Sequence, residues 1–232
     1  MEVEPDLAID MANTNTHSSE KSPRRRAPRF ELISGDAFGL DFINTRDDRF
    51  SDESKELLND YVDLARFAED AGALSPSHVD RLIERSPLAP EDARTSLAAA
   101  IHLRETMYAV FSAIMAKKPV PVGALLTLNQ YVQAAAGHLQ LAPKSKNASG
   151  PFEWRFEETP LDFDAPWWPI ARSAGELLAS DKLPYVRACE SKTCQWFFLD
   201  TSKNHRRRWC DMTKCGNRAK AQRFYARQKE ER

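Results

Sequence analysis

Residues 189–215 read CESKTCQWFFLDTSKNHRRRWCDMTKC and contain all four cysteines of the chain. The cysteines form two pairs with four residues inside each pair, and fifteen residues separate the pairs. Two short loops joined by a longer arm are typical of a four-thiolate zinc site, because each loop brings two sulfurs to the same ion. We therefore predict one structural Zn²⁺ bound by Cys189, Cys194, Cys210 and Cys215.

Two other cysteine chemistries fit this pattern less well. No apolar signal segment follows Arg24, Arg25 and Arg26, so we expect a cytoplasmic protein whose thiols stay reduced, which disfavours a pair of disulfides. A redox dithiol normally has two residues between its cysteines, and that spacing is absent. Zinc binding supplies about 10 kcal/mol of folding free energy to a segment of this kind. Four thiolates leave no open coordination position, so a zinc enzyme is not expected.

Charge is divided along the chain as sharply as the cysteines are. The chain has 33 Lys and Arg against 34 Asp and Glu, but residues 183–232 carry 13 basic and 5 acidic side chains, a net charge of +8. The remaining residues therefore carry −9. This partition predicts two domains with different roles. We expect a disordered tail over residues 1–28, a body over 29–182 and a zinc finger over 186–228.

The body is predicted to be α+β and mainly helical. Residues 30–33 and 39–43 are typical of two short strands around a turn. Ser75 and Pro76 are an N-cap and first-turn pair that opens a helix. Apolar residues recurring every three or four positions predict further helices over 51–71, 90–118, 122–136 and 166–180. An alternating pattern predicts an antiparallel pair over 138–141 and 152–156. Charges interrupt every apolar stretch early, so no membrane partner is expected.

A dense polar cluster follows the second predicted strand. Loops at strand ends often carry ligand-binding groups, although Asp, Asn and Thr equally serve turns and caps, and that alternative is the more frequent one. An enzyme would place its chemistry here, but no catalytic constellation is evident, and we predict a protein that is not an enzyme. The candidate ligand-binding residues are Asp41, Asn44, Thr45, Arg46 and Arg49.

The basic side chains of the tail are candidates for nucleic-acid binding. After four thiolates bind Zn²⁺, the tail keeps a net charge of about +6, and each phosphate contact adds roughly −0.9 to the log–log salt slope of binding. The candidates are His205, Arg206, Arg207 and Arg208 on the arm before the third cysteine, and Arg218, Lys220, Arg223 and Arg227 on a predicted helix over 216–228. In the alternative, Arg218 supports the zinc loops. Phe224 and Tyr225 are expected in the core of the finger.

Several motifs of the tail resemble the CGNR zinc-finger family. They are residues 194–197, 200–204, 206–212 and Cys215-Gly216-Asn217-Arg218, the motif that gives the family its name. The resemblance covers about residues 186–227, and it departs from the family in that no glycine stands beside Cys194. Residues 39–45, GLDFINT, and the helix that follows resemble the ABATE domain that commonly precedes this finger.

The resemblance implies a bacterial, stress-responsive transcription regulator. This resemblance and the predicted order of knuckle, hairpin and helix lead us to expect a small treble-clef-like finger after a helical domain. We expect the finger to bind duplex DNA while the body senses a small-molecule effector or forms a homodimer. Two alternatives remain open: an RNA- or ribosome-associated protein, and an enzyme with its site near Asp41–Arg49.

Overall fold

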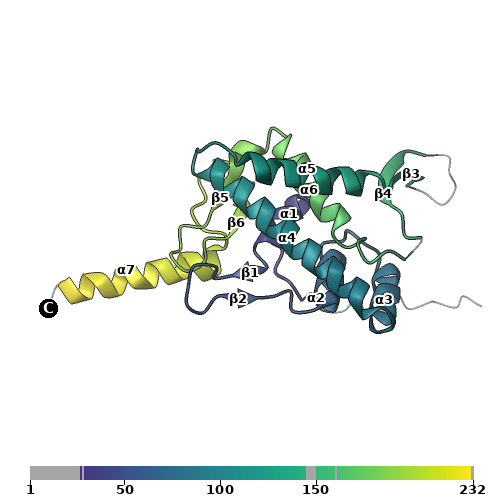
Figure 1. Cartoon of the computed structure of the whole chain (residues 1–232). Helices are drawn as coiled ribbons and strands as arrows, with labels where there is room; N and C mark the ends of the chain where they lie inside the picture. The colour runs from purple at the N-terminus through teal and green to yellow at the C-terminus, as the bar shows by residue number, and fades with distance from the viewer. Residues whose placement is uncertain (1–26, 28, 145–149, 160, 231–232) are drawn as a thin grey trace, which may run out of the picture.

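Helices make up most of the body, as the sequence predicts. The computed structural model describes residues 27, 29–144, 150–159 and 161–230, so the tail predicted over 1–28 lies almost entirely outside the described residues (Figure 1). The described helices are α1 (Phe38–Ile43), α2 (Tyr61–Asp70), α3 (Pro76–Arg85), α4 (Pro90–Met115), α5 (Val122–Ala136), α6 (Trp168–Leu178) and α7 (Asn217–Glu230). None of them is long and apolar enough to cross a membrane.

The described strands form three separate antiparallel pairs. They are β1 (Arg46–Asp47) with β2 (Lys55–Glu56), β3 (Leu139–Pro143) with β4 (Phe152–Phe156), and β5 (Val186–Ala188) with β6 (Phe197–Leu199). The hairpin of β3 and β4 confirms the pair predicted from alternation. Each of these strands therefore has a single neighbouring strand, and the core is built by helices and not by sheets.

Local capping chemistry sets several helix ends. The Ser75 side chain accepts a hydrogen bond from the His78 amide at the start of α3, as predicted. Gly72 has φ +66°, the left-handed conformation expected after a helix. The predicted helix over 51–71 begins only at Tyr61, because Asp60 caps it by accepting from the Asp63 amide, and residues 55–56 pair with β1 instead.

The prediction of strands over 30–33 and 39–43 is wrong. Residues 39–43, Asp41 included, are all buried in α1, and so short a run does not distinguish a buried strand from a buried helix segment. Residues 30–33 have no ladder partner, since the amides of Ile33 and Ser34 donate to the Asp41 carboxylate. Gly39 lets α1 approach α6, because a Cβ there would lie 3.2 Å from the Ala174 nitrogen.

One buried cluster joins the body and the first strands of the tail. Its largest fully buried side chains in the body include Phe42, Phe67, Phe111 and Trp168. Three residues of the β5–β6 hairpin belong to the same cluster: Val186, Phe197 and Leu199. The division into two domains near residue 183 therefore stays a prediction, and the described parts on its two sides share a core.

Candidate metal centre and nucleic-acid interface

The four cysteines meet at one end of the β5–β6 hairpin. Cys189 directly follows β5, and Cys194 precedes β6. Cys210 ends the arm, and Cys215 lies in a single π-helical turn, Met212–Gly216, from which α7 continues. All four are buried, and their sulfur atoms lie within 4.8 Å of one another. The four predicted ligands thus meet because the β5–β6 hairpin and the π-helical turn place their segments next to one another.

The sulfur geometry fits a tetrahedral ion. The Sγ atoms of Cys194 and Cys210 are 3.5 Å apart, and those of Cys210 and Cys215 are 3.7 Å apart. Four Zn–S bonds of about 2.3 Å at tetrahedral angles place the sulfurs about 3.8 Å apart. Hydrogen bonds from Cys194 and Cys210 lower the pKa of the Cys189 thiol. The four cysteines form a single zinc site.

Backbone hydrogen bonds hold the two loops in place. In the first loop the Cys189 amide donates to the Trp196 carbonyl at 2.8 Å. Gln195 has φ +51°, a conformation that favours glycine, at the position where the sequence departs from the family. In the second loop the Asp211 carboxylate accepts from the amides of Thr213 and Lys214 and so caps the turn that carries Cys215.

The residues after Cys215 connect the two loops. The Asn217 side chain donates to the Thr213 carbonyl at 2.9 Å, and the Arg218 guanidinium donates to the Thr193 hydroxyl at 3.0 Å. Thr193 belongs to the first cysteine loop, so Arg218 ties the start of α7 to it. Its side chain is nevertheless exposed. This supports the alternative in which Arg218 holds the zinc loops.

The finger is docked on the body by polar contacts around β6. The Asn44 side chain makes two buried hydrogen bonds with the backbone of Phe197. The Trp196 indole N–H donates to the Asp47 carboxylate at 2.8 Å. A further ion pair joins Lys214 of the finger to Glu31 of the body. Sequence reasoning missed these partners, because nothing local marks a contact across some 150 positions.

The candidate ligand-binding residues each have an intramolecular partner. Burial outweighs three hydrogen bonds from Ile33 and Ser34 and raises the pKa of Asp41 to about 6. Thr45 accepts from the buried Arg104, and the remaining two candidates pair with acids: Arg46 with Glu56 at 3.7 Å and Arg49 with Glu105. Asn44 belongs to the docking contact. As a ligand-binding site, this set stays a prediction.

The arm residues differ in how far the finger itself uses them. The His205 ring stacks on Tyr185 at 3.9 Å, and its Nδ1 contacts the Asp200 carbonyl oxygen. The Arg207 amide donates to the buried Asp200 carboxylate, and its guanidinium lies 4.8 Å from the centre of the Phe198 ring. Asp200 was not singled out from the sequence, although Asp followed two residues later by Ser is a recognised turn pattern.

Two arginines of the arm face solvent. Arg208 forms an ion pair with Glu190, and its guanidinium stays exposed to solvent. Arg206 is exposed and has no ion-pair or hydrogen-bond partner among the described residues. The arm therefore combines two residues that shape it with two that present positive charge.

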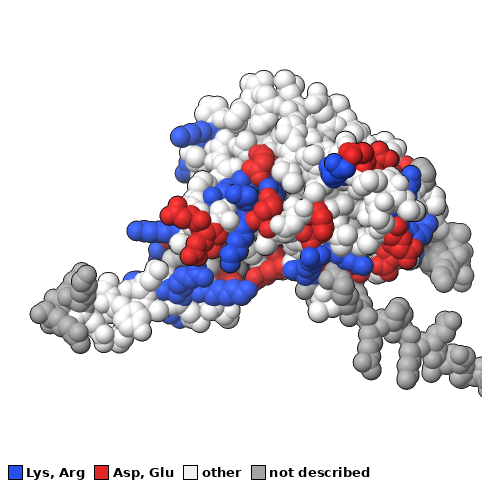
Figure 2. Space-filling model, turned by 60° about the horizontal axis from the view of Figure 1, so that its bottom comes forward, with Lys and Arg blue, Asp and Glu red and all other residues white. Residues whose placement is uncertain are grey.

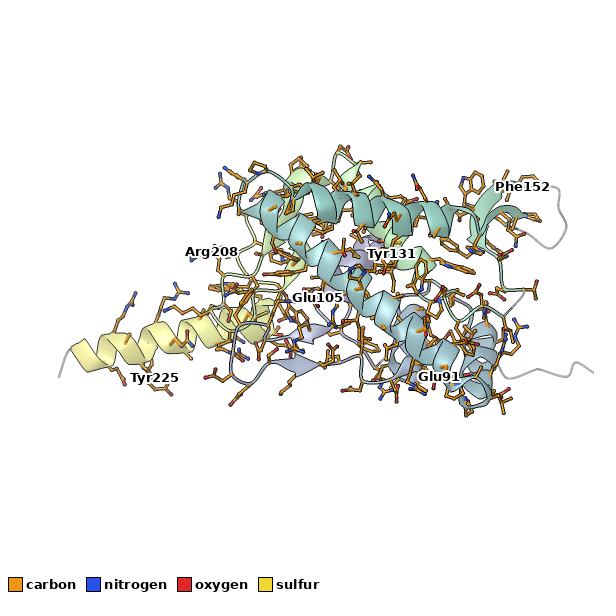
Figure 3. All side chains as sticks on the ribbon, viewed as in Figure 1. Glu91, Glu105, Tyr131, Phe152, Arg208 and Tyr225 are labelled. Carbon is orange, nitrogen blue, oxygen red and sulfur yellow. The ribbon has the colours of Figure 1, made fainter. Side chains whose placement is uncertain are left out.

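Helix α7 leaves the rest of the molecule (Figure 1). All its described side chains but Ala219 are exposed. Phe224 and Tyr225 are exposed by 58% and 68%, and Figure 3 shows Tyr225 pointing away from the body. The expectation that both lie in the core of the finger is wrong, because the small finger offers α7 no surface beyond its first turn. Residues 217–228 include Arg218, Lys220, Arg223 and Arg227 and no acidic residue.

Comparison with known families agrees with this architecture. The family model described as a "putative stress-induced transcription regulator", ABATE, matches residues 36–181, more than half of the chain. The chain belongs to the ABATE family. The CGNR zinc-finger model matches residues 185–228 and covers the ABATE chain's four clustered cysteines. No curated protein matches the chain.

Proposed function

We propose that this ABATE protein is a zinc-dependent transcription regulator that binds duplex DNA through α7 and the arginine arm, residues 205–208. The observation that carries the proposal is the isolation of α7, a cationic helix that projects from the body with its described length almost fully exposed. The family description supports a regulatory role. The zinc ion serves a structural purpose, since it fixes the turn from which α7 starts.

The dimensions and charge of α7 suit a major groove. Fourteen residues make a helix about 21 Å long, and a groove about 12 Å wide admits one helix. Lys220, Arg223 and Arg227 follow one another at helical spacing and share a face with the exposed Phe224. This face meets phosphates and base edges in the proposed complex, while Arg218 anchors the helix to the first cysteine loop.

In the same complex the arm supplies contacts beside the helix. Arg206 and Arg208 contact phosphates, whereas His205 and Arg207 hold the arm in position through Tyr185 and Asp200. The net negative charge of the body repels DNA. We also propose that the body senses an effector. Figure 2 shows acidic and basic side chains side by side where α7 joins the body.

A salt titration of binding tests this assignment. The triple variant Lys220→Ala, Arg223→Ala, Arg227→Ala is compared with wild type on random-sequence duplex DNA, with zinc content verified. Loss of three phosphate contacts makes the negative log–log salt slope shallower by about 2.7. The control replaces Lys118, Lys144 and Lys182, three exposed lysines of the body, with alanine. An unchanged slope in the α7 variant rejects the helix as the contact surface.

A parallel titration with single-stranded and duplex RNA of equal length addresses the alternative. The same cationic helix attracts any phosphate backbone, so only the preference separates the two functions. Tighter binding to RNA than to duplex DNA at physiological salt replaces the DNA proposal with an RNA-binding role. Sequencing of bound genomic duplex fragments then distinguishes a site-specific regulator, which enriches a defined sequence, from a non-specific binder.

A further inference from the structure

The β3–β4 hairpin has one face made only of apolar side chains. Residues directly opposite in an antiparallel pair share a face, as do alternate residues along each strand. The face consists of three cross-strand pairs, Leu139–Phe156, Leu141–Trp154 and Pro143–Phe152. Among the described residues, the first pair is covered by the body, where the Phe156 ring lies 6.2 Å from that of Trp168. Leu141, Trp154 and Phe152 are exposed by 59%, 56% and 57%.

This apolar face continues into a groove between α5 and α6. The groove has a volume of about 510 Å³, and its apolar lining includes Leu125, Leu128 and Val132 of α5 and Leu178 of α6. Arg172 and Glu176 of α6 also line it and form an ion pair with each other. Leu139 lines the groove and also belongs to the hairpin face, so the two surfaces are contiguous. We call them together the hairpin–α5 face.

Helix α5 adds to this face an exposed surface without charge. None of its fifteen residues is Asp, Glu, Lys or Arg, in a chain that is 29% charged. Val122, Leu125 and Leu126 are exposed by 74%, 43% and 60%. A surface helix normally carries charged residues on its outer side, and a two-stranded hairpin is marginally stable unless its apolar face is packed. Both features indicate a surface that is covered in the working molecule.

We propose that the hairpin–α5 face is the interface between two copies of this chain, related by a twofold axis. A twofold interface sets the same patch against itself, so a patch of one charge sign opposes like charges. The apolar side chains of this face avoid that repulsion, and its two groove charges, Arg172 and Glu176, already neutralise each other. Six of the twelve large apolar side chains that are exposed in the described part of the chain lie on this face, three on α5 and three on the hairpin, so exposed apolar side chains are concentrated where a second copy would cover them. An apolar side chain of the second copy fills the groove.

The position of this face is compatible with nucleic-acid binding by both copies. Helix α5 runs along the top of the molecule with the hairpin at its right end, and α7 projects from the lower left (Figure 1). Figure 3 places Phe152 of the hairpin and Tyr225 of α7 at opposite extremes of the structure. The dimer therefore keeps both α7 helices free, although its existence does not depend on what α7 binds.

Sedimentation equilibrium of the full-length, zinc-loaded chain tests the dimer. Wild type is expected at twice the chain mass of 26.3 kDa at micromolar concentration. The variants Leu125→Glu in the groove and Trp154→Glu on the hairpin are each expected at the monomer mass, with the dissociation constant raised at least about 100-fold. The reason is that each dimer would bury two unpaired carboxylates.

The matched control is Leu88→Glu in the 3₁₀ turn Ser86–Leu88, where the side chain is 83% exposed and lies outside this face. This variant keeps the wild-type mass. Far-UV circular dichroism and zinc content establish that each variant is folded. A wild-type chain that stays monomeric at all concentrations overturns the proposal. So does a dimer that survives both substitutions, or one that the Leu88 variant disrupts equally.

Discussion

The Asn44 side chain pairs with both backbone groups of Phe197, as a neighbouring strand would. Its Nδ2 donates to the Phe197 carbonyl at 2.8 Å, and its Oδ1 accepts from the Phe197 amide at 2.9 Å. Strand β6 has β5 on one edge, and Asn44 satisfies its other edge from the end of α1. The amide of one body residue thus fixes the finger on the body, and the Phe197 ring packs near Phe111 and Tyr108.

Substitution of Asn44 tests this contact. Asn44→Ala leaves a buried N–H and a buried C=O of Phe197 unpaired, which lowers the free energy of unfolding by about 2–4 kcal/mol. Urea unfolding measures the loss, and hydrogen exchange of the β6 amides is expected to accelerate. Asn204→Ala, at an exposed position of the arm, is the control and changes stability by less than about 0.5 kcal/mol. Equal effects of the two substitutions contradict the docking role.

Removal of zinc is expected to unfold the finger and to weaken the body. Cys210→Ser or a chelator removes one zinc ion per chain and releases residues 189–215 from their common ligand. Helices α1 to α6 remain, but the thermal midpoint falls because Phe197 and Leu199 belong to the shared core. Zinc analysis and circular dichroism at the helix band follow the two events. The control Thr201→Ala, at an exposed position, is expected to retain zinc. If the thermal midpoint of the body does not change when zinc is removed, the body and the finger do not share a core.

The strained residue beside Cys194 offers a stabilising change. Gln195 adopts φ +51°, which costs a non-glycine residue roughly 1 kcal/mol or more. Gln195→Gly is therefore expected to raise the free energy of unfolding by about 0.5–1 kcal/mol after the added freedom of the unfolded chain is counted. Urea unfolding provides the measurement. Gln222→Gly in the exposed helix α7 should instead lower helicity, since glycine disfavours helix.

A buried ion pair supports the region between α1 and α4. Arg104 is buried, and its guanidinium donates to both carboxylate oxygens of Glu56 at 2.6 and 2.7 Å. Although burial opposes it, hydrogen bonds from Arg104 and Leu58 lower the pKa of Glu56. Glu56→Ala leaves the buried guanidinium with Glu105 as its remaining carboxylate partner and should cost about 2 kcal/mol. Glu53→Ala, exposed in the same loop, should cost little in the same urea titration.

The Lys214 side chain lies close to α7 and forms an ion pair with Glu31. If α7 binds duplex DNA as proposed, Glu31→Gln frees Lys214 and removes a nearby negative charge. The affinity for duplex DNA at low salt should rise about threefold, because the loss of a negative charge near the interface strengthens the electrostatic attraction to the phosphates. Glu53→Gln changes the net charge equally at an exposed site of the body and should have a smaller effect. The comparison is made by fluorescence anisotropy on one duplex.

Short-range patterns in the sequence determined much of this protein. The cysteine spacing predicts a zinc site because a short loop can bring the two sulfurs of each pair to one ion. The cap at Ser75 and the apolar period of α4 and α5 predict helices because capping and helix faces involve residues within a few positions of each other. The net charge of the tail likewise follows from composition alone.

Tertiary structure decided the rest. Residues 39–43 form a helix and not a strand, since so short a run is compatible with either and only the neighbouring elements determine how it is buried. Asn44 serves the finger because folding brings β6 to the end of α1, and Phe224 and Tyr225 are exposed because α7 projects away from the described body. Each outcome depends on partners far away in the chain. Periodicity and spacing encode local geometry, whereas these contacts depend on the packing of the whole molecule.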